Sequence, residues 1–471
     1  MPLANGNFLV SIAFFGWIPV IFFLFRLLPH RRAVSTSLLV GWLFLPVATY
    51  DLPGFFDYNK TTATCLSVFL AAAFLDKDKR LWNFRPTRFD LPMLIWCMCP
   101  LMTSLSNGLG MYNGLSAAIQ QAILWGLPYV MGRAYFGDFK GLRELAIVLF
   151  IGGLIYIPLC LYEIRMSPQL HSIIYGFHQH NFSQTMRFGG WRPTVFLQHG
   201  LAVGLFMCMT SLIGTWLWYR MPSRIFPGRS VGWLVVLLLI TSVLVKSWGA
   251  LVLLALGLLV LFLSTMLRTR VFVMLLLLSF PLYIAARTVG GWSGDQLLAV
   301  AQLSGSEDRV ESLQTRLRSE YYLMERAKLQ PLFGWGGWDR SLVGDENNIV
   351  KTTEGLLVQV IPDSFWIVNY GMYGVFGLAS ITIALLMPLL LLTRRFPPNS
   401  WATPEIAPVA VLAIILGLYM VDNLMNDMVN PLFTLAAGGV IGALRGSQKE
   451  RACRIKPKAD TPVRMREKMA C

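Results

Sequence analysis

Runs of about 20 apolar residues recur along the whole chain and constrain its fold more than any other feature. Each run is long enough to cross a bilayer, and a helix satisfies every backbone amide within its own segment. Of the 471 residues, 55% are hydrophobic and 14% charged, whereas soluble domains carry roughly 25% charged residues. The predicted fold class is therefore all-α: a polytopic transmembrane helical bundle of about 12–13 spans with one large, helical extracytoplasmic loop.

Hydropathy divides the chain into membrane-spanning blocks and two long loops. The spans are expected near 7–28, 34–50, 61–75, 90–106, 114–132, 142–163, 196–218, 231–246, 248–266, 270–286, 366–393, 405–422 and 430–445. The corresponding blocks are N-terminal transmembrane helices over 1–163, an extracytoplasmic loop over 164–195, central transmembrane helices over 196–286, a large extracytoplasmic loop with helical content over 287–365, C-terminal transmembrane helices over 366–446 and a basic tail over 447–471.

The distribution of positive charge predicts the orientation of the chain. Short loops on one side of the predicted bundle, together with the C-terminal tail, hold most of the 40 Lys and Arg residues. Positive charge in short loops marks the cytoplasmic side. The tail is therefore expected in the cytoplasm, both long loops outside it, and the protein in the inner (cytoplasmic) membrane. Topology and anionic lipid explain the net charge of +15 without any nucleic-acid partner.

The large loop contains "EDRVESLQTRLRSEYYLMERAKL", which predicts an amphipathic helix. At helical spacing one face carries Leu313, Leu317, Tyr321 and Met324, and the stripe beside it carries Arg309, Arg316 and Glu320. The alternative is an ordinary solvated helix with surface ion pairs.

A turn, "PLFGWGGW", follows that helix. Pro331 ends the helix, and the glycines allow a sharp change of backbone direction. Trp335 and Trp338 could stack on a sugar ring, or they could anchor the turn at the bilayer interface.

Two segments, "RLRSEYYLMERAKLQPLFGWGG" and "DSFWIVNYGMYGVFGLA", resemble the C-terminal half of the O-antigen ligase and O-antigen polymerase superfamily. In that family an arginine opens a helix that runs to a Pro-Leu-Leu-Gly-x-Gly turn. A His-Asn, Asp-Ser or Asp-Asn pair then precedes a span with two glycines three apart. The matching positions are Arg316, Pro331, Gly334, Gly336, Asp363, Ser364, Gly374 and Gly377.

An earlier segment, "RPTVFLQHGLAVG", resembles the family's arginine-containing loop, with Arg192 as its arginine. The resemblance covers roughly residues 185–380. It departs at two positions. Trp248 replaces the arginine of the family's Ser-Arg-Gly-Ala segment. Asp363 stands where the ligases carry histidine, and at this position the chain is more similar to the polymerases.

The resemblance implies transfer of a polyprenyl-pyrophosphate-linked glycan to a saccharide or lipid-glycan acceptor outside the cytoplasm, without cofactor. Arginine forks suit the diphosphate. The candidates are Arg192 and Arg316, with Arg187 and Arg309 in reserve, and the possible further contacts are Glu320, His199, Trp335 and Trp338. Asp363 could be the general base, or it could cap the next helix. Lys246 is expected at the bilayer interface, with its ammonium extended toward water.

Other classes of protein and of site remain as alternatives. A transporter or flippase of lipid-linked glycans would show internal repeats and midplane charges, and neither is evident in the sequence. A non-catalytic membrane scaffold is the third possibility. The seven cysteines and five histidines show no metal-ligand spacing, so no metal site is predicted.

Overall fold

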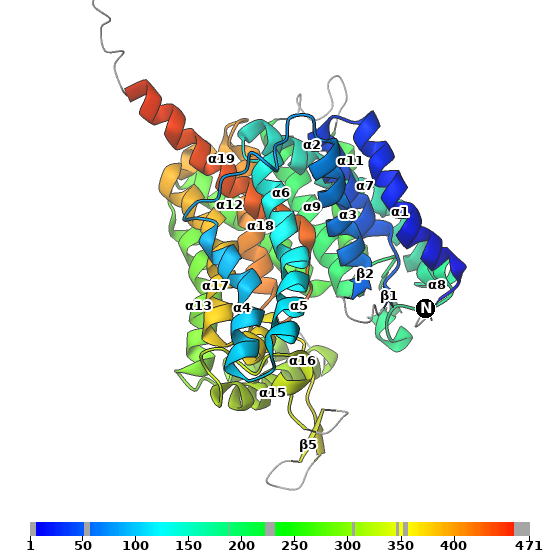
Figure 1. Cartoon of the computed structure of the whole chain (residues 1–471). Coiled ribbons are helices and arrows are strands. Elements are labelled where there is room, and N and C mark those ends of the chain that lie inside the picture. Colours follow the sequence, from blue (N-terminus) through cyan, green and yellow to red (C-terminus); the bar gives the residue numbers. More distant parts are fainter. Residues whose placement is uncertain are drawn as a thin grey trace, which may run out of the picture.

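The computed structural model describes residues 6–50, 57–187, 189–221, 231–303, 307–344, 348–351 and 357–455, excluding the side chains of 308, 309 and 446–455. Within these residues, helices stand side by side and run in alternating directions between two ends of the molecule (Figure 1). The described part of the chain contains six helices that are long and apolar enough to cross a membrane, and five shorter apolar helices accompany them. The predicted polytopic helical bundle is confirmed.

The predicted spans coincide with helices along the described chain. The bundle consists of α1 (Phe8–Leu27), α2 (His30–Phe44), α3 (Lys60–Leu75), α4 (Leu91–Ser106), α5 (Met111–Gln121) continued through a π-turn (Ala122–Gly126) into α6 (Leu127–Tyr135), α7 (Phe139–Met166), α9 (Gly200–Arg220), α11 (Gly232–Leu244), α12 (Trp248–Met266), α13 (Val271–Thr288), α17 (Phe365–Arg395), α18 (Ala407–Asp422) and α19 (Pro431–Ile455). A short 3-10 turn (Pro398–Ala402) joins α17 to α18.

Side chains on the outer helices are apolar on both their buried and their exposed faces. In α1, Val10 and Phe14 are buried, whereas Phe8 and Phe15 are exposed. A soluble helix would turn polar residues outward, so this all-round apolar pattern is that of a helix in contact with lipid.

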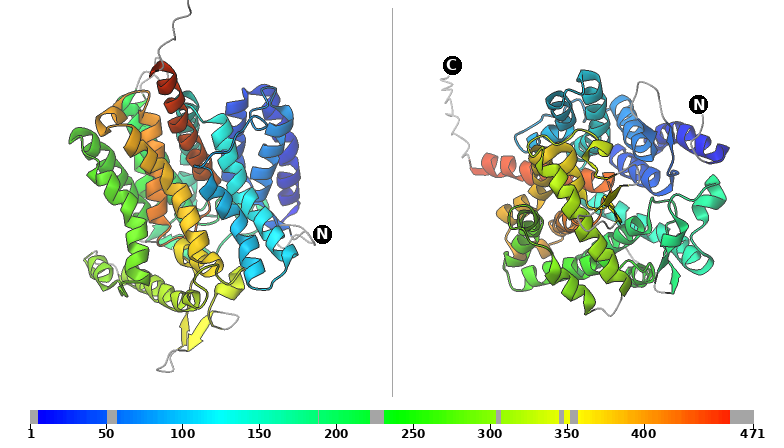
Figure 2. Two further views of the ribbon diagram at one scale, coloured as in Figure 1. Left: turned by 60° about the vertical axis from the view of Figure 1, so that its left-hand side comes forward. Right: turned by 90° about the horizontal axis from the view of Figure 1, so that it is seen from below.

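Both long loops lie at the same end of the bundle, and α15 (Glu307–Lys328) crosses that end (Figure 2). The first loop holds α8 (Leu170–Tyr175), a 3-10 turn (Phe182–Thr185) and the antiparallel pair β3 (Met186–Arg187) and β4 (Gly190–Trp191). The second loop also holds α14 (Asp295–Gln302), α16 (Trp338–Ser341) and the antiparallel pair β5 (Ile349–Lys351) and β6 (Leu357–Gln359). A further pair, β1 (Thr49–Tyr50) and β2 (Tyr58–Asn59), joins α2 to α3 at this end.

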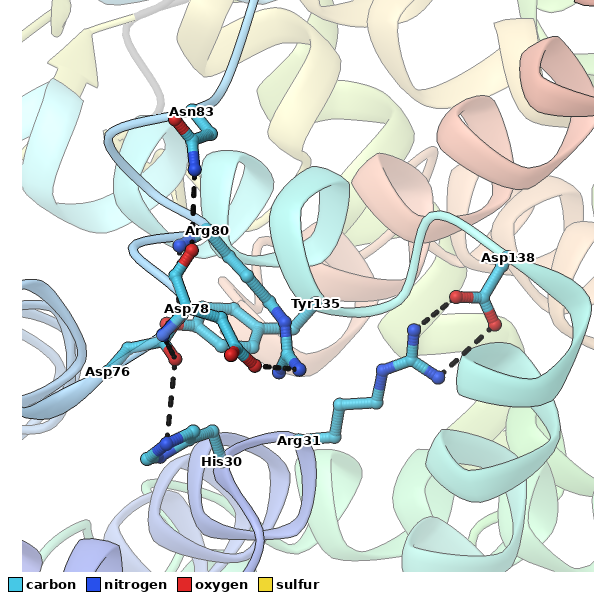
Figure 3. A network of polar contacts seen from close by, with 8 residues as sticks. All are labelled: His30, Arg31, Asp76, Asp78, Arg80, Asn83, Tyr135 and Asp138. Carbon is cyan, nitrogen blue, oxygen red and sulfur yellow. Dashed lines mark hydrogen bonds and ion pairs between the residues drawn. The ribbon is translucent and has the colours of Figure 1, made fainter.

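The opposite end carries ion pairs in which each cation faces a carboxylate (Figure 3). Arg31 pairs with Asp138, Arg80 lies 2.6 Å from Asp78, and His30 lies 3.5 Å from Asp76, which also accepts a 2.8 Å hydrogen bond from Tyr135. Arg31 and Arg80 at this end therefore each have a carboxylate partner.

The amphipathic helix predicted in the large loop is present as α15, but its buried face is rotated from the prediction. Leu317 and Met324 are buried as expected, whereas Tyr321 is exposed and Glu320 is buried. The placement of Tyr321 on the buried face was wrong. Buried Glu320 aligns with Leu317 and Met324 at spacings of three and four residues, and this spacing defines one helical face.

Candidate functional site

Glu163, at the end of α7, fixes the path of the first long loop. Its buried carboxylate accepts backbone hydrogen bonds from Leu170 at 3.0 Å, Thr194 at 2.8 Å and Val195 at 2.7 Å. Because a buried carboxylate must find donors, these three amides draw both halves of the loop toward the same point. The loop is therefore held where Arg192 can reach the start of α9.

Arg192 is held between that loop and the junction of α11 with α12. Its backbone N–H donates to the carbonyl of Thr185 at 2.7 Å, and its Nη2 donates to the carbonyl of Lys246 at 3.5 Å. The side chain is only 8% exposed, and it crosses Gly200 so closely that an added Cβ there would lie 2.3 Å from Arg192 Cδ. The absence of a side chain at Gly200 leaves the room that this arginine occupies.

Arg187 and Arg192, from the β3–β4 segment of the first loop, lie within electrostatic reach of Arg316 on α15. Burial, followed by the charges of Arg187 and Arg316, lowers the pKa of the Arg192 guanidinium to about 10. Within the described residues neither Arg187 nor Arg192 forms an ion pair with a carboxylate, and Arg192 Nε is buried without a hydrogen-bond partner. Lys246 adds another cation, since its Nζ donates to the carbonyl of Arg187 at 3.4 Å.

This arginine cluster (Arg187, Arg192 and Arg316) differs from the opposite end of the protein, where the arginines shown in Figure 3 face carboxylates. Arg316 faces one carboxylate, Asp363, whereas Arg187 and Arg192 face none among the described residues, and such an excess of positive charge is unfavourable unless an anion enters. Guanidinium forks bind phosphate oxygens in pairs. The cluster therefore has the chemistry of a phosphate or diphosphate site.

His199 lies in the positive electrostatic field of the arginine cluster, and its imidazole is neutral. Its Nδ1 accepts the backbone N–H of Leu201 at 3.0 Å, which caps α9, and its Nε2 lies 3.3 Å from Gln184 Oε1. Burial, His180 and the arginine cluster lower the pKa of His199 to about 3. With one nitrogen accepting and the other facing an amide oxygen, His199 acts here as a helix cap.

Arg316 and Asp363, which are 47 positions apart in the sequence, lie beside each other. Arg316 Nε is 3.8 Å from Asp363 Oδ2, and the Asp363 side chain is 47% exposed. A general base at Asp363 would therefore be open to solvent. The cap role is not observed: among the described residues no side chain caps α17, and the N–H of Phe365 donates instead to the carbonyl of Asn426 at 3.1 Å.

Glu320 is fully engaged inside the protein and does not face the arginine cluster. One carboxylate oxygen accepts from Ser364 Oγ at 2.9 Å and Trp366 Nε1 at 3.0 Å. The other accepts from Tyr283 at 2.8 Å and Arg287 Nε at 3.2 Å. Its expected role as a sugar contact is therefore wrong, because four donors already surround the carboxylate. The network instead joins α13, α15 and the start of α17.

The glycines of "PLFGWGG" permit backbone-to-backbone packing against a break in α17. Gly334 has φ +67°, and an added Cβ would lie 2.5 Å from the backbone nitrogen of Tyr373. Gly374 has φ +65° inside α17, and its added Cβ would lie 2.3 Å from the carbonyl oxygen of Leu332. Only glycine tolerates both the conformation and the contact. The turn thus holds the end of α15 against α17.

The two tryptophans of the turn have different surroundings. The guanidinium carbon of Arg326 lies 3.6 Å from the centroid of the Trp335 ring, and Trp335 Nε1 donates to the Arg326 carbonyl at 2.9 Å. One face of Trp335 is therefore covered, whereas Trp338 is exposed. Of the two, Trp338 is the more accessible to a sugar. The side chain of Arg309, the remaining predicted site residue, lies outside the described residues.

Sequence reasoning gave no role to three buried charged residues that shape this site: Glu163, Arg287 and Lys60. Lys60 donates from Nζ to the carbonyl of Phe196 at 2.7 Å. Each lies near the end of an apolar run, where a charge is normally assumed to reach water. Each has at least one partner 30 or more positions away, the backbone of Thr194 and Val195 for Glu163, the carboxylate of Glu320 for Arg287 and the carbonyl of Phe196 for Lys60, so the sequence contains no local signal of these contacts.

No family model matches the chain, and no curated protein matches it.

Proposed function

We propose that this protein is a membrane glycosyltransferase that moves a glycan from a polyprenyl-pyrophosphate carrier to a saccharide acceptor at the extracytoplasmic side of the inner membrane. The observation that carries the proposal is the arginine cluster, in which Arg316 faces Asp363 while Arg187 and Arg192 pair with no carboxylate among the described residues. A lipid diphosphate is a ligand of the charge and shape that such a cluster binds.

The proposed chemistry follows from the donor. The acceptor hydroxyl oxygen bonds to the anomeric carbon of the donor sugar while the bond from that carbon to the diphosphate oxygen breaks. The bonding electrons leave with the polyprenyl diphosphate, and fixed guanidinium groups stabilise the charge that develops there. The acceptor proton passes to a carboxylate, for which Asp363 is the residue that the sequence suggests. No nucleotide is needed, because the diphosphate is already a good leaving group.

The order of motifs supports the same proposal. The resemblance to the O-antigen ligase and polymerase superfamily rests on Arg192, Arg316 and Asp363, which are distant in sequence. In the folded chain Arg316 lies next to Asp363, and its positive charge contributes to lowering the pKa of Arg192. A non-catalytic scaffold gives no reason for these particular residues to meet.

The proposal is tested by deleting the gene and separating the envelope polysaccharides by size. Loss of long chains with retained repeat units is the result expected of a polymerase, and intact chains left on the carrier lipid are expected of a ligase. Accumulation of unmodified lipid-linked glycan on the cytoplasmic side would contradict the proposal and favour a flippase.

A further inference from the structure

A non-helical segment between α18 and α19, residues 423–430, lies beside the start of α17. The carbonyl of Asn426 accepts the N–H of Phe365 at 3.1 Å, and the carbonyl of Met428 accepts the Tyr419 hydroxyl at 2.9 Å. Asn430 then caps α19, accepting the N–H of Leu432 at 3.0 Å. The segment is thus fixed at both ends and holds Asp427 close to Asp363.

Asp427 differs from the two other aspartates of this region. Asp422 accepts a hydrogen bond from Asn426 Nδ2 at 2.9 Å, and Asp363 faces Arg316. Asp427 makes no hydrogen bond or ion pair with any residue that the structure describes. A carboxylate without donors, placed beside a second carboxylate, is the arrangement that favours proton uptake.

The charged and titratable groups around Asp427 are few. Asp363 precedes α17, Tyr373 lies on α17, and Tyr419 and Asp422 lie on α18, with Arg316 beyond them on α15. Burial, followed by the charge of Asp363, raises the pKa of the Asp427 carboxyl to about 7. A general base works best when its pKa lies near the operating pH.

A cavity of about 300 Å³ lies beside the end of this segment, at the residues that follow Asp427. Met428 and Asn430 form one wall, Gln198 and Ala202 of the α9 region form another, and Thr49 and Asn59 from the β1–β2 connection close it. Ligand pockets occupy about 300–1,000 Å³ and combine apolar walls with a few polar groups. In the chain, Gln198 precedes His199 and Met428 follows Asp427, so two walls of the cavity come from segments that also carry the cap of α9 and the Asp427 carboxylate.

We infer that the acceptor sugar binds in this cavity and that Asp427 is the group that takes the proton from its attacking hydroxyl. The inference rests on the proposed function and deepens it. The hydroxyl proton passes to the Asp427 carboxylate as the oxygen bonds to the anomeric carbon, and the carbon–oxygen bond to the diphosphate breaks toward the arginine cluster. Asp363, which the motif order suggests for this role, is instead 47% exposed and lies 3.8 Å from Arg316, and it orients that arginine.

The test compares Asp427→Asn with the wild-type full-length protein, using a synthetic polyprenyl-diphosphate-linked oligosaccharide as donor. Loss of a positioned base lowers kcat by about 10²–10⁴-fold. The base must be ionised, so wild-type turnover should fall as the pH drops below about 7. This fall of activity at low pH should be absent from the residual activity of Asp427→Asn. In Asp427→Glu it should occur at a different pH. The affinity for inorganic pyrophosphate should not change.

Two further variants separate the parts of the inference. Ala202→Phe fills the cavity and should raise the KM for the acceptor while leaving pyrophosphate affinity unchanged. Asp339→Asn, on exposed α16, is the matched control and should behave as wild type. If Asp427→Asn keeps the wild-type kcat and the wild-type fall of activity at low pH, Asp427 is not the base. If Ala202→Phe leaves the KM for the acceptor unchanged, the acceptor does not bind in this cavity. If Arg192→Lys also leaves turnover and pyrophosphate binding intact, the proposed function itself fails.

Discussion

Replacing Glu320 by glutamine should destabilise the protein strongly, although the two side chains have the same size. The substitution removes the negative charge opposite Arg287, whose side chain is only 4% exposed, and Arg287 Nε lies 3.2 Å from the carboxylate. Removing one partner of a buried ion pair costs about 3–5 kcal/mol, because the remaining charge stays buried without compensation. Since every 1.4 kcal/mol is about tenfold, this corresponds to roughly a 10²–10⁴-fold shift toward the unfolded state.

The hydrogen bonds of Glu320 add to this effect. Four donors, from Tyr283, Arg287, Ser364 and Trp366, point at two carboxylate oxygens. A glutamine side chain offers only one acceptor oxygen. Its NH₂ group faces the two donors that were bonded to the other carboxylate oxygen. The hydroxyl groups of Tyr283 and Ser364 can rotate away, whereas the N–H groups of Arg287 and Trp366 cannot. The range of about 3–5 kcal/mol is therefore a fair expectation for the single substitution.

The assay is the apparent unfolding temperature of the purified protein in detergent, measured beside Glu325→Gln. Glu325 stands on the same helix, is 52% exposed and lies 2.9 Å from Lys328. Exposed pairs of this kind contribute about 0–1 kcal/mol, so the control should melt close to wild type. A Glu320→Gln protein that has the unfolding temperature of the control but has lost activity would refute the structural role and point to a catalytic role for Glu320.

Three other outcomes are expected. Arg192→Lys and Arg316→Lys should each fail to restore full kcat/KM toward the lipid-linked donor, because an ammonium lacks the paired donors of guanidinium; wild-type kinetics in both would leave the cluster with structural roles. Glu163→Gln should make the loop 167–199 more susceptible to limited proteolysis than in wild type, since it keeps one acceptor oxygen for three amides; equal cleavage rates would argue against the anchor. A reporter that is active only in the periplasm should be inactive when fused after Gly446, and activity there would reverse the proposed orientation.

The helical bundle and the approximate positions of its apolar helices could be predicted from the sequence because each apolar run must satisfy its own backbone in lipid. The same reasoning located α15, since its charges and leucines repeat at helical spacing. It misplaced Tyr321 and Glu320 because an aromatic residue was assumed to be buried and a carboxylate to be exposed. Glu320 is buried by its pairing with Arg287, 33 positions away, and this pairing depends on the tertiary fold.

The site was accessible to sequence reasoning only in part. Arg192, Arg316 and Asp363 could be selected from motif order, but their neighbours depend on how separate helices meet. Asp427 gave no local signal, because a lone aspartate between two apolar runs is usually a solvated loop residue. Its significance comes from the Asn426–Phe365 contact, which brings the segment next to Asp363.

The central claim is tested most directly by reconstituting the purified protein in lipid vesicles with a labelled polyprenyl-diphosphate-linked oligosaccharide and a saccharide acceptor, without nucleotide. Glycosyl transfer predicts one molecule of free polyprenyl diphosphate released for each glycan joined to acceptor, and loss of both products when Arg192 and Arg316 are replaced by alanine. Movement of the intact donor across the bilayer, with no free polyprenyl diphosphate formed, would contradict the proposed activity.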